Sequence, residues 1–143
     1  GVHTGSNSSG PTSIKVNQWT NVVAVFDQNT NNRVTIYVNG VSENPISITQ
    51  GDVTNAVDLG IGRRLATNDN DFHGLVDAPV IWDTQLIEDE IQTIFTQGPA
   101  FNISSIQSGS IKGNWKFDDS GNTLTDEEEN SNGANTSTIQ TGI

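Results

Sequence analysis

The chain has 143 residues, the length of one ordinary domain with a single buried core. Its formal net charge is −11, with six Lys and Arg residues against 17 Asp and Glu residues, so no basic patch for nucleic acid or an anionic membrane can form. It has no Cys, which excludes disulfides, thiolate zinc sites and cysteine catalysis, and it has no stretch of roughly 20 apolar residues that would span a membrane.

The first half of the chain predicts a meander of short antiparallel strands. A short strand is expected near residues 14–16, and residues 19–27 ("WTNVVAVFD") are strongly β-prone. Residues 33–40 ("RVTIYVNG") alternate between apolar and polar side chains, as a half-buried strand does. Because Asn39-Gly40 is typical of a two-residue hairpin turn, residues 41–48 should return antiparallel to that strand.

The middle of the chain predicts two more strands and the only helix. Residues 56–62 ("AVDLGIG") have strand character, and residues 72–83 ("FHGLVDAPVIWD") form the longest apolar stretch. Pro79 cannot donate to a strand ladder, which favours an edge or a bulge there. Apolar residues then recur at helical spacing behind an acidic first turn, which predicts one short helix near 85–97 that packs as a lid on the strands.

The last part of the chain predicts a linker and a further strand. Residues 99–110 are interpreted as a linker with one weak strand, and residues 111–119 ("IKGNWKFDD") as a strand with Trp115 and Phe117 on one face. Seven to nine short strands and one helix predict an all-β antiparallel sandwich. All three tryptophans are expected in its core: Trp19, Trp82 and Trp115.

Two blocks in this order resemble a known family. Residues 19–40 look like the laminin-G-like (concanavalin-A-like lectin) pattern of a Trp, a strand ending near an Asp, and a Tyr-Val-Asn-Gly hairpin. "LGIGRR" and "FHGLVDAPVIWDTQLIEDEI" resemble the block that closes such domains. The ordered match runs to about residue 95 and implies a concanavalin-A-like jelly-roll fold. The chain departs from the family at Ile87, where a Ser or Thr cap is usual, so Thr84 is the expected cap. It departs again at Pro79 or Ala78, where the family commonly has an acidic or polar residue.

A third block is out of order. "WKFDDSGNTLTD" is similar to the family's opening block but follows the closing one. We therefore expect residues 1–100 to be the C-terminal portion of a laminin-G-like sandwich and residues 101–112 a linker or edge strand. Residues 113–143 are an N-terminal-type block, docked on the same sandwich or exchanged between chains. A fragment cut across a tandem repeat, a circular permutation and a strand-exchanged dimer all explain this order. We favour docking, since an exposed lone strand would promote aggregation.

The sequence does not predict an enzyme. Glycosidases of this fold need paired carboxylates on one strand. The acidic clusters of this chain fall at a helix start (88–90) and in a loop (126–129), and neither His3 nor His73 has an evident Ser or Cys partner. We therefore assign no catalytic residue.

A calcium site is implied by the resemblance. Asp77 in "GLVD" and three residues of "FDDSGN" (Asp118, Asp119 and Asn122) occupy positions similar to a calcium site of some family members. Calcium prefers such clustered carboxylate and carbonyl oxygens. The alternative is that Asp119 and Asn122 make turn hydrogen bonds while Asp77 caps a strand end.

Sugar recognition combines an aromatic surface with fixed polar groups. The candidates are Tyr37, Asn39, Arg64, Asn70 and His73. Each also has a structural interpretation; Tyr37, for example, can be a cross-strand packing residue.

The resemblance implies a non-catalytic, carbohydrate-binding module of a larger secreted or surface bacterial protein. The chain begins at Gly1 and lacks Met, so we expect it to be excised from a longer protein or to follow a removed signal. The expected partners are a polysaccharide or glycan and neighbouring repeats or an exchanged copy, without nucleic acid or membrane insertion. Two alternatives stay open: a calcium-stabilised structural or adhesive repeat without sugar binding, and the non-catalytic part of a polysaccharide-degrading enzyme.

Overall fold

A computed structural model describes the backbone of six segments: residues 14–27, 32–47, 58–62, 72–119, 123–128 and 133–134. The chain divides into two compact units. The first unit is formed by residues 1–53 and 84–107, and the second by residues 54–83 and 108–143. Each unit is described separately below.

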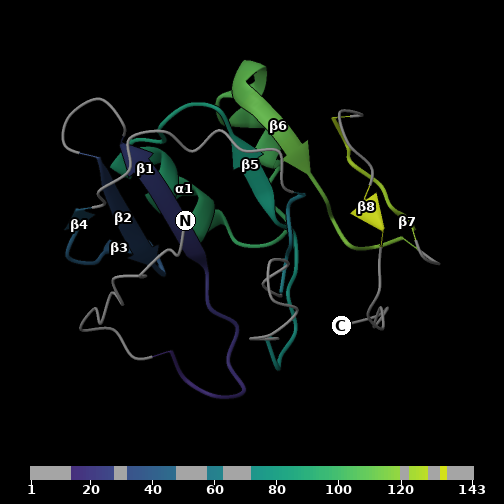
Figure 1. Cartoon of the computed structure of the whole chain (residues 1–143), viewed down its shortest axis with the longest axis horizontal. Coiled ribbons are helices and arrows are strands. Elements are labelled where there is room, and N and C mark those ends of the chain that lie inside the picture. Colours follow the sequence, from purple (N-terminus) through teal and green to yellow (C-terminus); the bar gives the residue numbers. More distant parts are fainter. Residues whose placement is uncertain are drawn as a thin grey trace. The chain divides into compact units, whose positions relative to one another are not determined.

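The first unit is built on a four-stranded antiparallel sheet (Figure 1). β1 (Val22–Asp27) pairs with β2 (Arg33–Val38) along its full length, from Val22 opposite Val38 to Asp27 opposite Arg33. β3 (Val41–Ser42) and β4 (Ile46–Ser47) both pair with β2 as well. The expected antiparallel return after residue 40 is confirmed.

The turn between β2 and β3 follows from its two residues. Asn39 and Gly40 have φ angles of 50° and 77°, the left-handed values that a tight two-residue hairpin turn requires. Asn39 also continues the β1–β2 ladder, because its N–H donates to the Asn21 carbonyl (2.9 Å) and its Oδ1 accepts from the Asn21 N–H (3.0 Å). The turn is thereby fixed at the end of the sheet.

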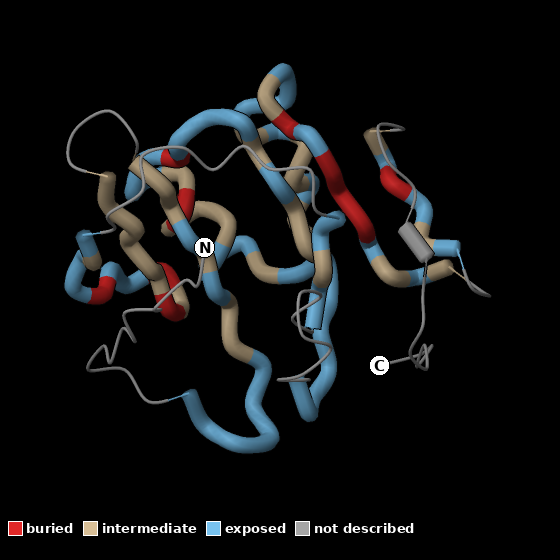
Figure 2. The backbone as a smooth tube through the Cα atoms, viewed as in Figure 1, coloured by how far each residue is buried: buried red, intermediate tan, exposed pale blue. Residues whose placement is uncertain are grey.

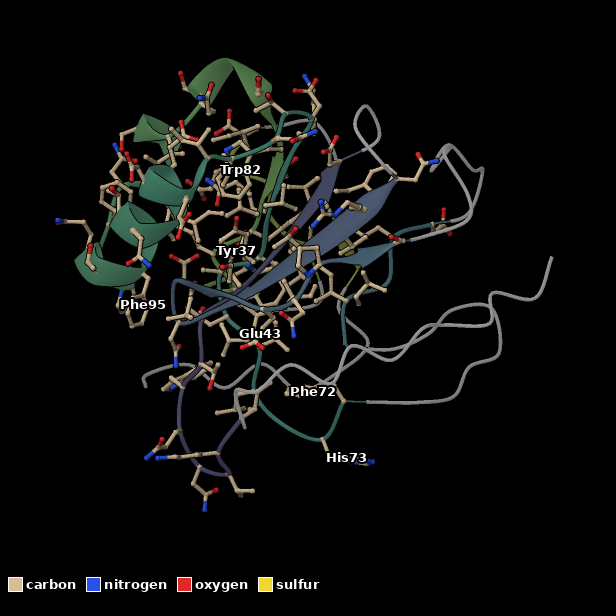
Figure 3. The ribbon with its side chains drawn as sticks, turned by 90° about the vertical axis from the view of Figure 1, so that its left-hand side faces the viewer. Tyr37, Glu43, Phe72, His73, Trp82 and Phe95 are labelled. Carbon is tan, nitrogen blue, oxygen red and sulfur yellow. The ribbon has the colours of Figure 1, made fainter. Side chains whose placement is uncertain are left out.

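One face of this sheet is covered by α1 (Glu88–Gln97), as Figures 1 and 3 both show. Gln85 Nε2 donates to Asp27 Oδ1 (3.2 Å) at one end of the hairpin, and Gln92 Nε2 donates to the Gly40 carbonyl at the other. Ile91 is 0% exposed and is the most deeply buried apolar side chain of the described residues. The predicted helix and its role as a lid are confirmed for this sheet.

The start of α1 differs from the expectation. The N-cap residue is Ile87, and its N–H donates to Glu90 Oε2 at 2.9 Å. The carboxylate three residues into the helix thus satisfies the main chain where no Ser or Thr is present. The prediction that Thr84 caps the helix is wrong.

The second unit contains two short antiparallel pairs. β5 (Val80–Trp82) pairs with β6 (Ile111–Asn114), with a register shift between Ile81 and Trp82. β7 (Thr123–Leu124) pairs with β8 (Gly133–Ala134). The longest buried run of the described chain lies along β6 and into Trp115 (Figure 2). A bulge was expected near Pro79. The register shift between Ile81 and Trp82 lies two to three residues after it.

Several expected strands are shorter or missing. Residues 14–18 contain a turn in which Asn17 has a φ of 62°, so the strand expected at 14–16 is wrong. Residues 58–62 and 72–79 are also not in strands, and residues 99–110 contain the 3₁₀ turns η1 (Ile103–Ser105) and η2 (Ser108–Ser110) in place of a weak strand. Polar turn residues outweigh the β-propensity of the isolated Ile and Val residues between them.

The aromatic residues also depart from expectation. Trp19 is 58% exposed and precedes β1, so its assignment to the core is wrong. Trp115 is buried and Trp82 is half-buried. β6 ends at Asn114, and Phe117 has a φ of 57°, so the chain turns before Trp115 and Phe117 can share a strand face.

All described strand pairs are antiparallel, and α1 is the one α-helix within the described residues. This agrees with the predicted all-β class. None of the helices in the described part of the chain is long and apolar enough to cross a membrane.

Candidate functional site

Asp119 organises a turn in the second unit. Its Oδ2 accepts from the Thr125 N–H and its Oδ1 accepts from the Thr125 hydroxyl, both at 2.7 Å. The main-chain donor, followed by the hydroxyl donor, holds the pKa of Asp119 below its ordinary value of 3.8, because both bonds favour the charged carboxylate. Asp119 therefore closes the loop that leads through β7.

The other members of the expected calcium set are less constrained. Asp77 and Asp118 are exposed, and Asn122 lies outside the described residues. Within the described segments, no three His, Cys, Asp or Glu side chains gather in a group that could hold a metal ion. The three aspartates are thus not brought around one point, and the calcium assignment stays a prediction.

Asp126 is the most deeply buried charged residue among the described residues of the second unit. It is 0% exposed, and its Oδ1 accepts from the N–H groups of Asn114 (2.8 Å) and Glu128 (3.1 Å). Glu127 N–H donates in turn to the Asn114 carbonyl at 2.8 Å. The Asp126 carboxylate therefore accepts the main-chain N–H that a neighbouring strand would otherwise accept at the end of β6. It links residues 126–128 to that strand.

Two exposed ion pairs flank this junction. Lys112 Nζ lies 3.0 Å from Asp83 Oδ2, and Lys116 Nζ lies 2.7 Å from Glu127 Oε2. The hydrogen bond from Lys112 lowers the pKa of Asp83, and the hydrogen bond to Glu127 raises the pKa of Lys116. Solvent screens both pairs, so they orient the strands more than they stabilise them.

The expected sugar-binding residues fall in different parts of the chain. Tyr37 is half-buried, and the register places it on the same sheet face as Asp27, the face that α1 covers. The amide oxygen of Asn39 is engaged by Asn21. His73 is exposed in the second unit (Figure 3), while Arg64 and Asn70 lie outside the described residues. The described residues thus place Tyr37 and Asn39 in one unit and leave the rest of this set a prediction.

Trp19 is a candidate that the sequence reading missed. Its side chain is 58% exposed, and its neighbours Asn17 and Gln18 are exposed as well. A large aromatic side chain in a polar, turn-containing segment offers a flat apolar surface with amide groups beside it. The signal in the sequence is the run of amide residues around Trp19, because a tryptophan of the core usually has apolar neighbours.

Glu43 is the second missed residue. It is 5% exposed, and neither of its carboxylate oxygens has a hydrogen-bond partner. It follows β3, whose two residues are both exposed, and its N–H donates to the Ile36 carbonyl at 2.7 Å. Because Val41 and Ser42 are exposed, the sequence gives no signal that the next residue is buried.

Comparison with known proteins adds one finding. A laminin G-type family model, described as "Concanavalin A-like lectin/glucanases superfamily", matches residues 1–92 of the 143. The matched region contains β1 to β5 and the first half of α1, and it ends before β6. No curated protein and no solved structure gives a significant match to the chain.

Proposed function

The chain belongs to the concanavalin A-like lectin/glucanase superfamily, and on that premise we propose that it is a non-catalytic carbohydrate-binding module of a larger secreted or surface bacterial protein. Membership confirms the laminin-G-like resemblance and the all-β sandwich class. It fits a lectin-like or a structural domain. The choice of the lectin-like role rests on the exposed aromatic residue at the start of the sheet.

Trp19 carries this proposal. Sugar rings stack their apolar C–H faces on aromatic side chains while amides bind their hydroxyls, so a binding surface needs both groups side by side. Trp19 is 58% exposed, with the exposed amides of Asn17 and Gln18 adjacent in sequence. Asn21, two residues further on, is bonded to Asn39, which ties this segment to the β2–β3 turn.

The charge of the chain narrows the ligand class. A protein with a net charge of −11 repels the negatively charged uronic-acid and sulfated polysaccharides, most strongly at low salt. We therefore expect a neutral polysaccharide to bind, and an anionic one only in high salt or through a bridging cation.

Affinity gel electrophoresis with neutral and anionic polysaccharides tests the proposal. We expect a neutral polysaccharide to retard the wild-type protein and Trp19→Ala to weaken this binding at least tenfold. Phe72→Ala is the matched control, because Phe72 is also a strongly exposed aromatic residue (60%) but belongs to the second unit. If no polysaccharide retards the wild type, the carbohydrate-binding proposal is wrong; if Phe72→Ala loses binding and Trp19→Ala does not, the assignment to Trp19 is wrong.

The structural alternative rests on calcium at Asp77, Asp118, Asp119 and Asn122. It is supported by the exposed carboxylates of Asp77 and Asp118, which are open to an ion. The bonds from Thr125 occupy both oxygens of Asp119 and weigh against it. A chain that melts at a higher temperature with calcium, loses this gain in Asp118→Asn and binds no polysaccharide would favour this alternative.

A second alternative is an appended, non-catalytic part of a polysaccharide-degrading enzyme. Such a module would bind sugar in the same assay without turnover.

A further inference from the structure

The outer edge of β1 is open in the first unit. β1 lies at one end of the sheet order, so β2 is its one strand neighbour among the described residues (Figure 1). The side chains of Val22 (53%) and Ala24 on this strand are exposed. Because an edge strand carries a row of main-chain donors and acceptors, it is a surface on which another strand can pair.

The hydrogen bonds of the sheet show which groups of β1 point outward. The Asn39 N–H donates to the Asn21 carbonyl at 2.9 Å, so this pair and every second pair after it are the bonded pairs of the β1–β2 ladder. Val22, Ala24 and Phe26 fall between the bonded pairs, and their N–H and carbonyl groups therefore point away from β2. No described residue bonds to these outward groups.

β1 lacks the features that usually protect an edge strand from pairing. Its sequence, VVAVFD, contains no Pro, Gly or Lys, and its register with β2 runs without a bulge. Its one charged residue is Asp27, at the very end of the strand. Short apolar segments of β-branched and aromatic residues pair readily with further strands. The edge is therefore suited to a strand partner.

We propose that two copies of the chain pair through this edge, with β1 antiparallel to β1 of the second copy about a two-fold axis at Ala24. In this register Val22 lies opposite Phe26 of the second copy and Ala24 lies opposite Ala24, so the outward main-chain groups of both strands are satisfied. A β-branched residue opposite an aromatic one is a favourable cross-strand pair, and by symmetry it occurs on both sides of the axis. The small Ala side chain leaves room where the two copies meet at the axis.

The charges of β1 also favour an antiparallel second copy. The register centred on Ala24 places the two Asp27 carboxylates at opposite ends of the strand pair, each opposite the neutral Asn21 of the other copy. A parallel pairing in register would place the two carboxylates side by side, where like charges repel. The net charge of −11 on each chain opposes association over longer distances, so salt should strengthen this dimer by screening.

Sedimentation equilibrium over a range of protein concentrations tests the proposal. We expect the wild type to dimerise, more tightly at high than at low NaCl concentration, and Ala24→Pro to raise the dissociation constant at least tenfold. Proline removes an N–H group that no described residue bonds, and it is tolerated on the open side of an edge strand, so the monomer should keep its fold. Circular dichroism of the dilute variant checks this.

Val41→Lys is the matched control for the edge. Val41 is exposed (58%) and shares the sheet face of Val22, but it belongs to β3 and lies away from the open edge of β1. It should dimerise as the wild type does. A wild type that stays monomeric would overturn the proposal. So would a dimer that Val41→Lys disrupts and a folded Ala24→Pro variant does not, because that result places the contact on the sheet face.

Hydrogen exchange on the wild type removes the dependence on a variant that folds. The amides of Val22, Ala24 and Phe26 should exchange at least tenfold more slowly above the dissociation constant than below it. The amides of Val23 and Val25 are directed at β2 in both states and should change much less. A dimer in which the three outward amides gain no protection associates through another surface and would refute the pairing of β1 with its copy.

Discussion

Replacing Asp126 by Ala should destabilise the second unit more than any other single change to an acidic side chain there. The substitution removes the acceptor of the Asn114 and Glu128 N–H groups. Hydrogen bonds to a charged group each contribute about 1.5–3 kcal/mol, and a buried donor left without an acceptor loses its full solvation as well. Asn114 is buried, so water cannot replace the lost acceptor there. Removal of a buried charge offsets part of this loss, and we expect a net loss of about 3 kcal/mol in the free energy of unfolding.

Urea unfolding followed by tryptophan fluorescence measures this loss, because Trp115 is buried beside Asn114 and reports on the second unit. Asp126→Asn keeps the volume and one acceptor oxygen, so its loss should be smaller than that of Asp126→Ala. Glu127→Gln is the matched control, since it neutralises the next carboxylate but breaks only an exposed ion pair. If Asp126→Ala unfolds at the same urea concentration as Glu127→Gln, Asp126 does not hold the loop to β6 and the reasoning fails.

Two further predictions concern the turn at Asp119 and the cover of the first sheet. Because the folded-state pKa of Asp119 is depressed, its stabilising effect is present above its ordinary pKa of 3.8 and is lost as the pH falls through the lower folded value. Proton NMR of the Thr125 amide should show the turn opening below about pH 4, and Asp119→Asn should show no such transition. Ile91→Ala should lower the free energy of unfolding by about 2–5 kcal/mol, because Ile91 is fully buried. Ile87→Ala is the control and should have little effect, because Ile87 is exposed in the same segment. Equal losses in urea unfolding would contradict the packing of α1 on the sheet.

The hairpin of the first unit was predictable because its signals are local. Alternation along β2 and the Asn39-Gly40 pair fix a register that needs no distant contact. The helix was predictable for the same reason, through the spacing of its apolar residues. Its cap was not, because Glu90 accepts the Ile87 N–H in place of the usual Ser or Thr.

The strands around residues 72–83 and 111–119 were predicted too long. Each is an apolar run whose pairing extends only as far as its partner does, and only three residues of β5 pair with β6, with a register shift between Ile81 and Trp82. Beyond Asn114 the side chain of Asp126 replaces a strand neighbour, and no local pattern announces that a carboxylate twelve residues away will accept a main-chain N–H. Propensity therefore indicated where strands lie, and tertiary contacts decided where they end.

The candidate sites show the same limit. Trp19 was placed in the core because tryptophan is usually buried, yet the turn at Asn17 and the start of β1 only at Val22 leave it exposed. Glu43 was not among the predicted site residues. Its burial and its unpaired oxygens depend on the packing around the sheet, which the exposed residues of β3 do not reveal.

The β5–β6 pair joins residues on either side of the predicted boundary at residue 100. The connection from β5 to β6 leaves at Asp83 and returns at Ser110, and these two residues are themselves bonded, N–H to carbonyl, at 2.8 Å. Pairing within one chain benefits from a high effective concentration that exchange between two chains lacks. The Lys112–Asp83 ion pair crosses the same strands, and Trp115 N–H donates to the Pro79 carbonyl at the other end (3.1 Å). Docking of residues 113–143 on their own chain stays our proposal, because exchange between two chains would rebuild the same bonds at the additional entropic cost of association.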